Sequence, residues 1–511
     1  MGIPSYFSFI IKNYNNIIKK REELNSIQHL CMDCNSIIYD SFYDIEKKYN
    51  KKTFENGDIE ELIIQSVIQN IEVLINEISP SKTVFITFDG VAPFAKMNQQ
   101  RKRRYKSSFM AKIGSINKSQ KNWNTTFITP GTEFMEKLSL QINYHFLYKQ
   151  KKYNCSNVKV SCSDEIGEGE HKIFQWIRET NLLDDHVAIY GLDSDLIMLS
   201  IFHKQFAKNI YVFREAPDFR NVVEENIKKE EKEKLFMDIE KLSMCIFSKM
   251  VGSTSNYDSR SVYDYIFICF LLGNDFLPHI ISLNIRTIGI DVILETYKQT
   301  IGKYSDRSLI HHVTKDIQWK YFGMFINELS KKEHQNIIQE HTIRDKFEKR
   351  NWPMKTTEDK EQLIENIPII YRSEEKYICP TETGWETRYY RTLFDIEPNE
   401  NEIKKICENY IEGLAWIFQY YTKGVQNHQW NYKYHYAPLL QDLKKYIGNV
   451  DIHSIYEYKH GYTKEEQLRY VIPNEILLEI FPNDDTIEKK DIDYKVKWAY
   501  CRYLWEAHPV L

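Results

Sequence analysis

Three apolar, β-rich segments of this chain each end in an aspartate, and helix-like segments separate them along the sequence. The segments are 29–33 (HLCMD), 83–89 (TVFITFD) and 186–193 (HVAIYGLD). Helical patterns include 59–78 and a stretch that begins near Gly169. Apolar strands that alternate with helices are typical of a parallel sheet covered on both faces. We therefore predict an α/β fold with a doubly wound, mainly parallel sheet and flanking helices.

Acidic side chains recur where these segments end and in two further places, the loops IGEGEH and GNDFLPH. Any single one of these acids is most simply a helix cap or a turn residue, so the prediction below depends on their recurrence. Ligands of open α/β sheets gather beyond the carboxyl ends of the strands, and clustered carboxylates repel one another unless divalent cations neutralise them. The acids predict a two-metal centre of the kind that hydrolyses phosphodiesters. They are Asp33, Asp89, Glu168, Glu170, Asp193, Asp195 and Asp275.

A run of cations follows Asp89 in GVAPFAKMNQQRKRRYK. On a helix from Ala95 onward, positions i, i+4, i+7 and i+8 share one face. Such a face could bind a terminal phosphate through charge-assisted hydrogen bonds. The alternative is a solvated basic helix, or a nuclear-import signal made by RKRR. The residues on the face are Lys96, Gln100, Arg103 and Arg104.

Composition limits the classes of protein to be considered. The 511 residues are 42% hydrophobic and carry a net charge of −4, which disfavours both wholesale disorder and a uniformly basic coat for nucleic acid. The nine cysteines and the lack of a targeting segment favour reduced thiols and a cytoplasmic protein, with the nucleus as the alternative. Residues 215–260 are charged and weakly patterned, which is typical of a solvated helix or an insertion.

Several strings together resemble the XRN family of 5′→3′ exoribonucleases, within the superfamily of metal-dependent 5′ nucleases. They are MGIPSYF, AKMNQQR, PGTEFM, GEGEHKI, YGLDSDLIML, GNDFLPH, GWETRYY, GLAWIFQYY, WNYKYHYAP and EEQLRYVIP. The resemblance implies a PIN-like 5′-nuclease core with a second, largely helical block packed on it to wall the active site. We expect a nuclease domain at 1–304, a charged connecting segment at 305–384 and the second block at 385–511. We also expect a compact member without the long C-terminal extensions of the large cytoplasmic ones.

The resemblance also implies roles for particular residues. The seven acids would hold two Mg²⁺ or Mn²⁺ ions, and the four residues on the basic helix face would form the pocket for a 5′-monophosphate. Family members clamp the first bases between a histidine and a tryptophan. Here Tyr39 stands where that histidine is expected, and the segment NHQW supplies His428 and Trp430. The alternative is that these three aromatic side chains belong to the core.

The implied activity is processive 5′→3′ hydrolysis of 5′-monophosphorylated single-stranded RNA to mononucleotides, in RNA or mRNA decay. We expect a monomer without membrane attachment, in the cytoplasm, or in the host cytoplasm if the protein is viral. One alternative is a 5′→3′ DNA exonuclease or a flap endonuclease. A catalytically inactive RNA-binding scaffold is disfavoured because none of the seven acids is missing.

Overall fold

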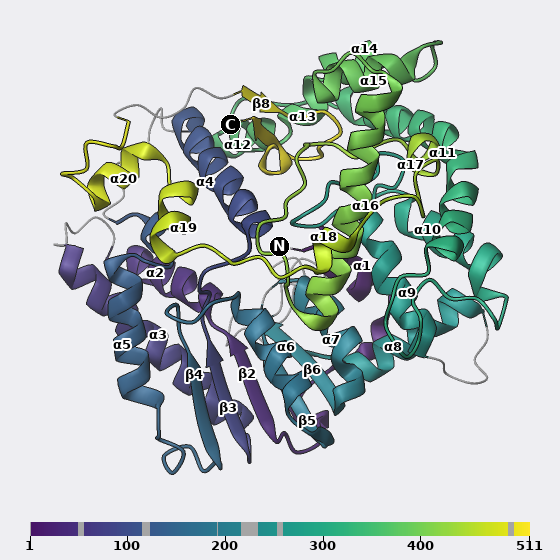
Figure 1. Cartoon of the computed structure of the whole chain (residues 1–511). Helices are drawn as coiled ribbons and strands as arrows, with labels where there is room; N and C mark the ends of the chain where they lie inside the picture. Colours follow the sequence, from purple (N-terminus) through teal and green to yellow (C-terminus); the bar gives the residue numbers. More distant parts are fainter. Residues whose placement is uncertain are drawn as a thin grey trace.

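The computed structural model describes residues 2–49, 56–114, 123–191, 193–215, 234–252, 259–488 and 495–510. Within them, a sheet of seven strands has the order β1-β7-β6-β5-β2-β3-β4 (Figure 1). The strands are β1 (Ile18–Lys19), β2 (His29–Asp33), β3 (Thr83–Thr87), β4 (Asn157–Ser161), β5 (Leu182–Tyr190), β6 (Ala207–Glu215) and β7 (Lys234–Asp238). β2 to β6 pair in parallel, and β7 and β1 extend the sheet antiparallel. The predicted α/β fold with a mainly parallel sheet is confirmed.

Helices cover both faces of this sheet (Figure 1). One face carries α2 (Asn35–Tyr49), α3 (Asn56–Ile78) and α5 (Glu133–Phe146), and the other carries α1 (Tyr6–Asn13), α6 (Gly169–Glu179), α7 (Asp195–His203) and α8 (Ile239–Val251). Successive side chains of a strand point to opposite faces. Accordingly, Leu30 and Met32 of β2 join the core under the first group of helices, whereas Cys31 joins the core under the second.

A second block, mainly helical, lies beside the sheet (Figure 1). Its central helix is α16 (Glu400–Lys423), and Trp416 and Phe418 share one core with side chains of α7, so the two blocks pack together. The other elements are α9 (Ser259–Cys269), α10 (Gly289–Tyr297), α11 (Trp319–Glu348), α12 (Thr357–Glu365), α13 (Ile367–Ile370), α14 (Ser373–Ile378), α15 (Trp385–Phe394), α17 (Leu440–Leu443), α18 (His453–Tyr456), α19 (Lys464–Val471), α20 (Asn474–Ile480), β8 (Lys495–Lys497) and β9 (His508–Val510).

One long helix connects the sheet to this block. α4 (Phe94–Gly114) follows β3 and runs away from the sheet, contacting α19 and β9 (Figure 1). The helix predicted from Ala95 onward is therefore present, and its start lies at the edge of the sheet where the predicted acids gather.

Two charged stretches prove more structured than their composition suggests. Of residues 215–260, 216–233 and 253–258 lie outside the described residues, whereas the described part includes β7 and α8. The prediction of a solvated helix or an insertion is wrong for the described part of this stretch, because Ile239, Leu242 and Ile246 are buried. The segment 305–384 contains α11 to α14. No helix in the described ranges is both long enough and apolar enough to cross a membrane.

Candidate active site

Four of the predicted acids lie where neighbouring parallel strands end. Asp33 is the last residue of β2, and Asp89 comes two residues after the end of β3. Asp193 and Asp195 follow β5, and Asp195 begins α7. Because β2 pairs in parallel with both β3 and β5, these strand ends meet at one edge of the sheet, as predicted for a ligand site.

Glu168 and Glu170 reach the same edge from the start of α6. The residue between them, Gly169, donates its N–H to Asp89 Oδ1 at 2.7 Å. A Cβ at Gly169 would lie 2.7 Å from Asp33 Oδ1, closer than side chains allow. Glycine at this position therefore lets the loop pack directly on both aspartates.

Lys96 of α4 joins Glu168 to the seventh acid, Asp275. Its ammonium lies 2.5 Å from Glu168 Oε2 and 3.0 Å from Asp275 Oδ2. Burial alone would lower the pKa of Lys96, but the carboxylates of Glu168 and Asp275 outweigh it and hold that pKa well above its usual value. Lys96 is therefore a cation within the acid cluster, at the end of α4 nearest the sheet.

The cluster holds more negative charge than Lys96 can balance. Burial, reinforced by neighbouring aspartates, raises the pKa of Asp33 well above its ordinary value. Burial and Asp195 do the same to Glu170, and burial and Asp275 raise the pKa of Asp195 to about 6. Asp33 Oδ1 and Glu170 Oε2 are buried and accept no hydrogen bond from the described residues. Unpartnered carboxylate oxygens are the ligands that hard divalent cations prefer, so these residues fit a metal centre.

A histidine that the sequence did not single out lies beside the two glutamates. Ligand atoms of Glu168, Glu170 and His171 all lie within 4.8 Å of one another, and the three residues are buried. The His171 ring stacks on Tyr420, with ring centroids 3.6 Å apart. Burial and then Lys96 lower the pKa of His171 well below its usual value. The imidazole is therefore neutral near pH 7 and does not offset the acids.

Two consecutive tyrosines of α16 close the site from the second block. The Tyr420 hydroxyl donates to Glu168 Oε1 at 2.6 Å, and the Tyr421 hydroxyl donates to Asp195 Oδ1 at 2.7 Å. Burial raises the pKa of both phenols well above 10.0, so both remain donors. The motif GLAWIFQYY includes both tyrosines. Nothing in the sequence, however, indicates that they donate to acids that lie 252 and 226 positions away along the chain.

Two residues near the N-terminus also hold acids in place. Asn35 donates to Asp89 Oδ2 at 2.5 Å and accepts the Asp89 N–H at 3.1 Å. Gly2 has φ 54°, and a Cβ there would lie 2.1 Å from Asp195 Oδ1. The only sequence signal for Asn35 is its position two residues after Asp33.

The remaining residues of the predicted phosphate face have different neighbours. Arg104 donates to the Ile128 carbonyl at 3.3 Å and to the Thr129 hydroxyl. Gln100 is buried, and its Oε1 accepts no hydrogen bond from the described part of the chain. Arg103 is half-buried and lines, together with Asp275, a cavity beside α4. The structure brings Lys96 to the acids, but it does not show the four side chains converging on one point.

The three predicted stacking residues differ in exposure. Tyr39 of α2 is half-buried and packs at the margin of the core beneath that helix. His428 is half-buried, and its carbonyl accepts the N–H of Phe94 at the start of α4. Trp430 is 7% exposed and stacks on Trp416, with centroids 5.1 Å apart. Trp430 therefore packs in the core, as the alternative interpretation of these three aromatic residues predicts, whereas the rings of Tyr39 and His428 are partly accessible.

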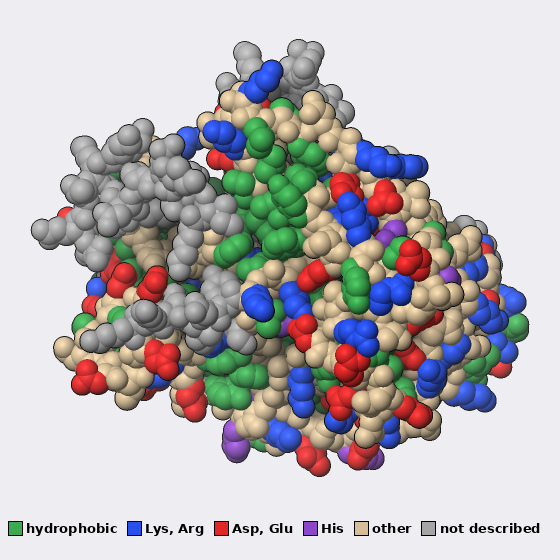
Figure 2. All heavy atoms as spheres, turned by 90° about the horizontal axis from the view of Figure 1, so that it is seen from above, with side chains coloured by type: hydrophobic (Ala, Val, Ile, Leu, Met, Phe, Trp, Pro, Cys, Tyr) green, Lys and Arg blue, Asp and Glu red, His purple; other side chains and the backbone are tan. Residues whose placement is uncertain are grey.

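Positive charge does not form a continuous coat on the described surface of the face that Figure 2 shows. On the face seen in Figure 2, Lys and Arg side chains are interspersed with Asp and Glu over the described surface. This agrees with the net charge of −4. Any affinity for a polyanion therefore has to come from local groups of cations such as those of α4.

Comparison with known proteins relates this arrangement to one family. A model described as the XRN 5′-3′ exonuclease N-terminus matches residues 1–216, and one described as the Xrn1 helical domain matches 255–380 and 375–480. The human 5′-3′ exoribonuclease 1 is 27% identical over 99% of this chain and 33% of its own length. The 5′-3′ exoribonuclease 2 of Gallus gallus is 26% identical over 93% of this chain and 63% of its own length. The chain thus spans a third to less than two thirds of the length of these relatives.

Proposed function

Because the chain belongs to the XRN family of 5′-3′ exonucleases, we propose that it hydrolyses single-stranded RNA from a 5′-monophosphate end and releases nucleoside 5′-monophosphates. The observation that carries the proposal is the undercompensated acid cluster at the start of a cationic helix, in which Glu168, Glu170 and Asp195 are buried and Asp193 is exposed. Such a cluster binds cations, and a cationic helix beside it binds phosphate. A role in RNA decay, in the cytoplasm or the nucleus, follows from the same proposal.

We propose that the seven acids hold two Mg²⁺ or Mn²⁺ ions. When bound, such ions supply an activated water and neutralise charge on the leaving 3′ oxygen. The protein's own part is to hold the carboxylates in position: Tyr420 orients Glu168, Tyr421 orients Asp195, and Asn35 orients Asp89. Their hydrogen bonds occupy one oxygen of each of these acids.

The end of the RNA would be recognised on α4. Lys96, Gln100, Arg103 and Arg104 are proposed to bind the terminal phosphate once substrate draws them together. Tyr39 and His428 are proposed to stack on the first bases, since aromatic rings bind bases of any sequence. The buried Trp430 would then support this region from behind through its contact with Trp416.

A digestion assay tests the proposal directly. Matched strands of RNA and DNA carrying a 5′-phosphate, a 5′-hydroxyl or a cap are incubated with the protein and Mg²⁺, and the products are resolved by length. We expect mononucleotides from 5′-phosphorylated RNA and little product from the other strands. Preferred digestion of DNA, or internal cleavage near a flap, would replace the proposal with the corresponding DNA nuclease. No digestion of any strand would support a binding scaffold.

A further inference from the structure

A cavity of about 360 Å³ lies on the flank of α4 that faces the C-terminal segment 499–509. Its volume falls within the range of about 300–1,000 Å³ that is usual for small-molecule sites. Asp275 belongs to both the acid cluster and the cavity wall, so the two spaces adjoin. The lining residues used below are Lys102, Arg103, Lys106, Asp275, Arg286 and Trp505.

The cavity carries an excess of positive charge. Both acids in its wall already have partners, because Asp275 pairs with Lys96 at 3.0 Å and Glu506 pairs with Arg286 at 2.6 Å. Lys106 donates to the Ala507 carbonyl at 3.2 Å. Lys102 has no ion-pair partner among the described residues. Four lysine and arginine side chains thus line the cavity with only two acids, and such an excess of cations favours an anionic ligand.

The titration of the lining groups supports this description. Burial and then Lys106 lower the pKa of Lys102 to about 8. Burial, followed by Lys102, lowers the pKa of His435 to about 3, and burial and Arg286 lower that of His279 to about 4. The histidines are therefore neutral near pH 7, and the lysines and Arg103 carry the charge of the cavity.

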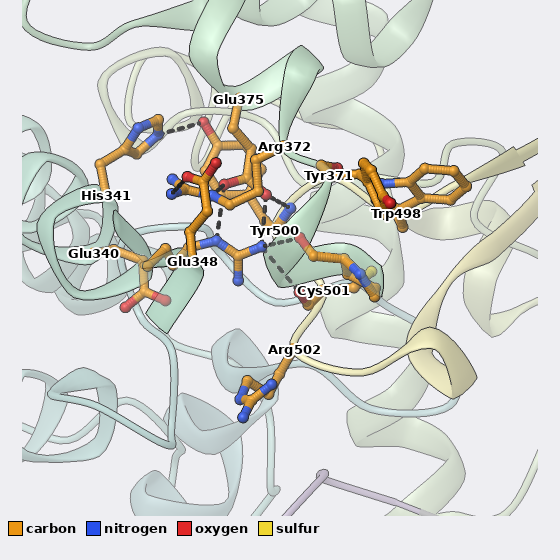
Figure 3. Close-up of polar contacts among 12 residues, drawn as sticks. Glu340, His341, Glu348, Tyr371, Arg372, Glu375, Trp498, Tyr500, Cys501 and Arg502 are labelled. Carbon is orange, nitrogen blue, oxygen red and sulfur yellow. Dashed lines mark hydrogen bonds and ion pairs between the residues drawn. The ribbon is translucent and has the colours of Figure 1, made fainter. Parts of the chain in front are cut away.

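The outer wall of the cavity is fixed by a buried ion cluster, shown in Figure 3. Glu375 of α14 binds Arg344 through two hydrogen bonds of 2.8 and 2.6 Å and also accepts the Tyr500 N–H at 2.8 Å. Arg344 in turn donates to the Cys501 carbonyl at 3.0 Å. Tyr500 and Cys501 both line the cavity, so the site is held in shape before any ligand arrives.

We propose that this cavity binds a nucleoside 5′-monophosphate, with the phosphate on Lys102 and Lys106 and the base near Trp505. The inference rests on the proposed function, in which this nucleotide is the product released beside Asp275. Trp505 is 41% exposed, and its ring, which stacks on Tyr503 with centroids 5.9 Å apart, is partly accessible. A cavity next to the acids then gives the cleaved nucleotide a place to go when its 5′-phosphate leaves the phosphate face of α4, so that the new 5′ end of the RNA can bind there.

The test measures binding of AMP to the metal-free, RNA-free protein by calorimetry. The variant Lys102→Met with Lys106→Met removes the charges but keeps the aliphatic stems, so packing is retained. We expect it to weaken AMP binding by at least about tenfold, because two charge-assisted bonds are lost. The matched control, Lys149→Ala with Lys151→Ala, removes two exposed lysines from the turn after α5 and should leave binding unchanged.

Further arms separate this site from the proposed 5′-phosphate pocket. AMP carries the same 5′-monophosphate as the RNA end, so calorimetry of the wild type should show two AMP sites. Arg104→Ala should weaken the site on the phosphate face and keep the cavity site, and the double lysine variant should do the reverse. An AMP titration of the double lysine variant that matches the wild type would overturn the inference, as would loss of both AMP sites in Arg104→Ala. Because no hydrolysis is involved, the AMP result stands even if the digestion assay refutes the proposed nuclease.

Discussion

Two groups of charged residues in this protein, one buried around Glu375 and one at the edge of the sheet, differ in how their charges are balanced. Around Glu375, Arg344 and Arg372 donate to the carboxylate and, although burial opposes them, lower the pKa of Glu375 (Figure 3). At the sheet edge, seven acids surround Lys96. Burial raises the pKa values of Asp33 and Glu170, whereas nearby positive charge lowers that of Asp193 and, against the effect of burial, that of Asp275. The first group is balanced in charge by its own residues. The second is not, because its charge is left for something else to neutralise.

The difference indicates how to separate a structural ion cluster from a functional one. In a balanced cluster every charged side chain has a partner of opposite charge, so the loss of one side chain leaves another buried and unpaired. An unbalanced cluster lowers the free energy of unfolding, and the protein retains the cluster because the site binds cations. Substitutions in the two groups should therefore have opposite consequences for stability and activity.

The largest expected effect is on hydrolysis by acid-cluster variants. Asp195→Asn keeps the shape of the side chain and the hydrogen bond from Tyr421 but removes a charged metal ligand, and Asp193→Ala removes another. Each should lower turnover on 5′-phosphorylated RNA by at least about a hundredfold while RNA binding persists, measured by product formation and by filter binding. Asp184→Asn, at the exposed start of β5, should behave as the wild type. A near wild-type rate for either cluster variant would contradict the metal assignment.

The balanced cluster should instead determine stability. Arg344→Met leaves Glu375 buried with one of its two arginines gone, and we expect a loss of about 3–5 kcal/mol in the free energy of unfolding. Denaturant titration measures it. Adding Glu375→Gln to Arg344→Met should recover part of the loss, because the buried charge is removed as well. An unchanged midpoint for Arg344→Met would mean that the cluster contributes little.

A smaller and more selective effect is expected on α4. Arg103→Ala with Arg104→Ala removes charge-assisted bonds to the terminal phosphate. Activity on 5′-phosphate ends should fall by roughly tenfold more than activity on 5′-hydroxyl ends. Initial rates on matched RNA strands give the ratio. If both substrates lose activity equally, these arginines form a general RNA-binding face.

The smallest effect is expected at Tyr39. Stacking on an aromatic ring contributes about 1–3 kcal/mol per base, so Tyr39→Ala should shorten processive runs and cause stalling on structured RNA. Tyr39→His should retain function because imidazole also stacks. If Tyr39→Ala lowers the melting temperature but leaves product lengths unchanged, the ring serves the core of α2 instead.

Sequence alone identifies the parts of the fold whose signal is local. β2, β3 and β5 appear as apolar runs because both of their faces are covered. β4 does not, since it lies at the edge of the sheet and alternates exposed and buried residues. β7 directly follows a charged stretch that masks its signal.

The candidate site divides in the same way. All seven acids can be predicted from the sequence, because each of them follows an apolar run or lies in a loop that contains glycine. Tyr420, Tyr421 and Gly2 cannot be assigned roles in advance, because they meet the acids only through packing of the second block and the N-terminus. The Lys102 cavity is likewise created by the return of the C-terminal segment to α4.

The most direct test of the account is the stability of Asp195→Asn without and with Mg²⁺. In the folded protein, burial raises the pKa of Asp195 from 3.8 to about 6. The stability that the protonated carboxyl contributes is therefore fully present below pH 3.8 and is lost as the pH rises through about 6. At neutral pH without metal, we therefore expect the asparagine variant to be more stable than the wild type by roughly 3 kcal/mol. The gap should vanish near pH 4, and Mg²⁺ should stabilise the wild type more than the variant. A metal-free variant that is less stable at neutral pH, or equal stabilisation of both proteins by Mg²⁺, would contradict the claim that this cluster is an unbalanced cation site.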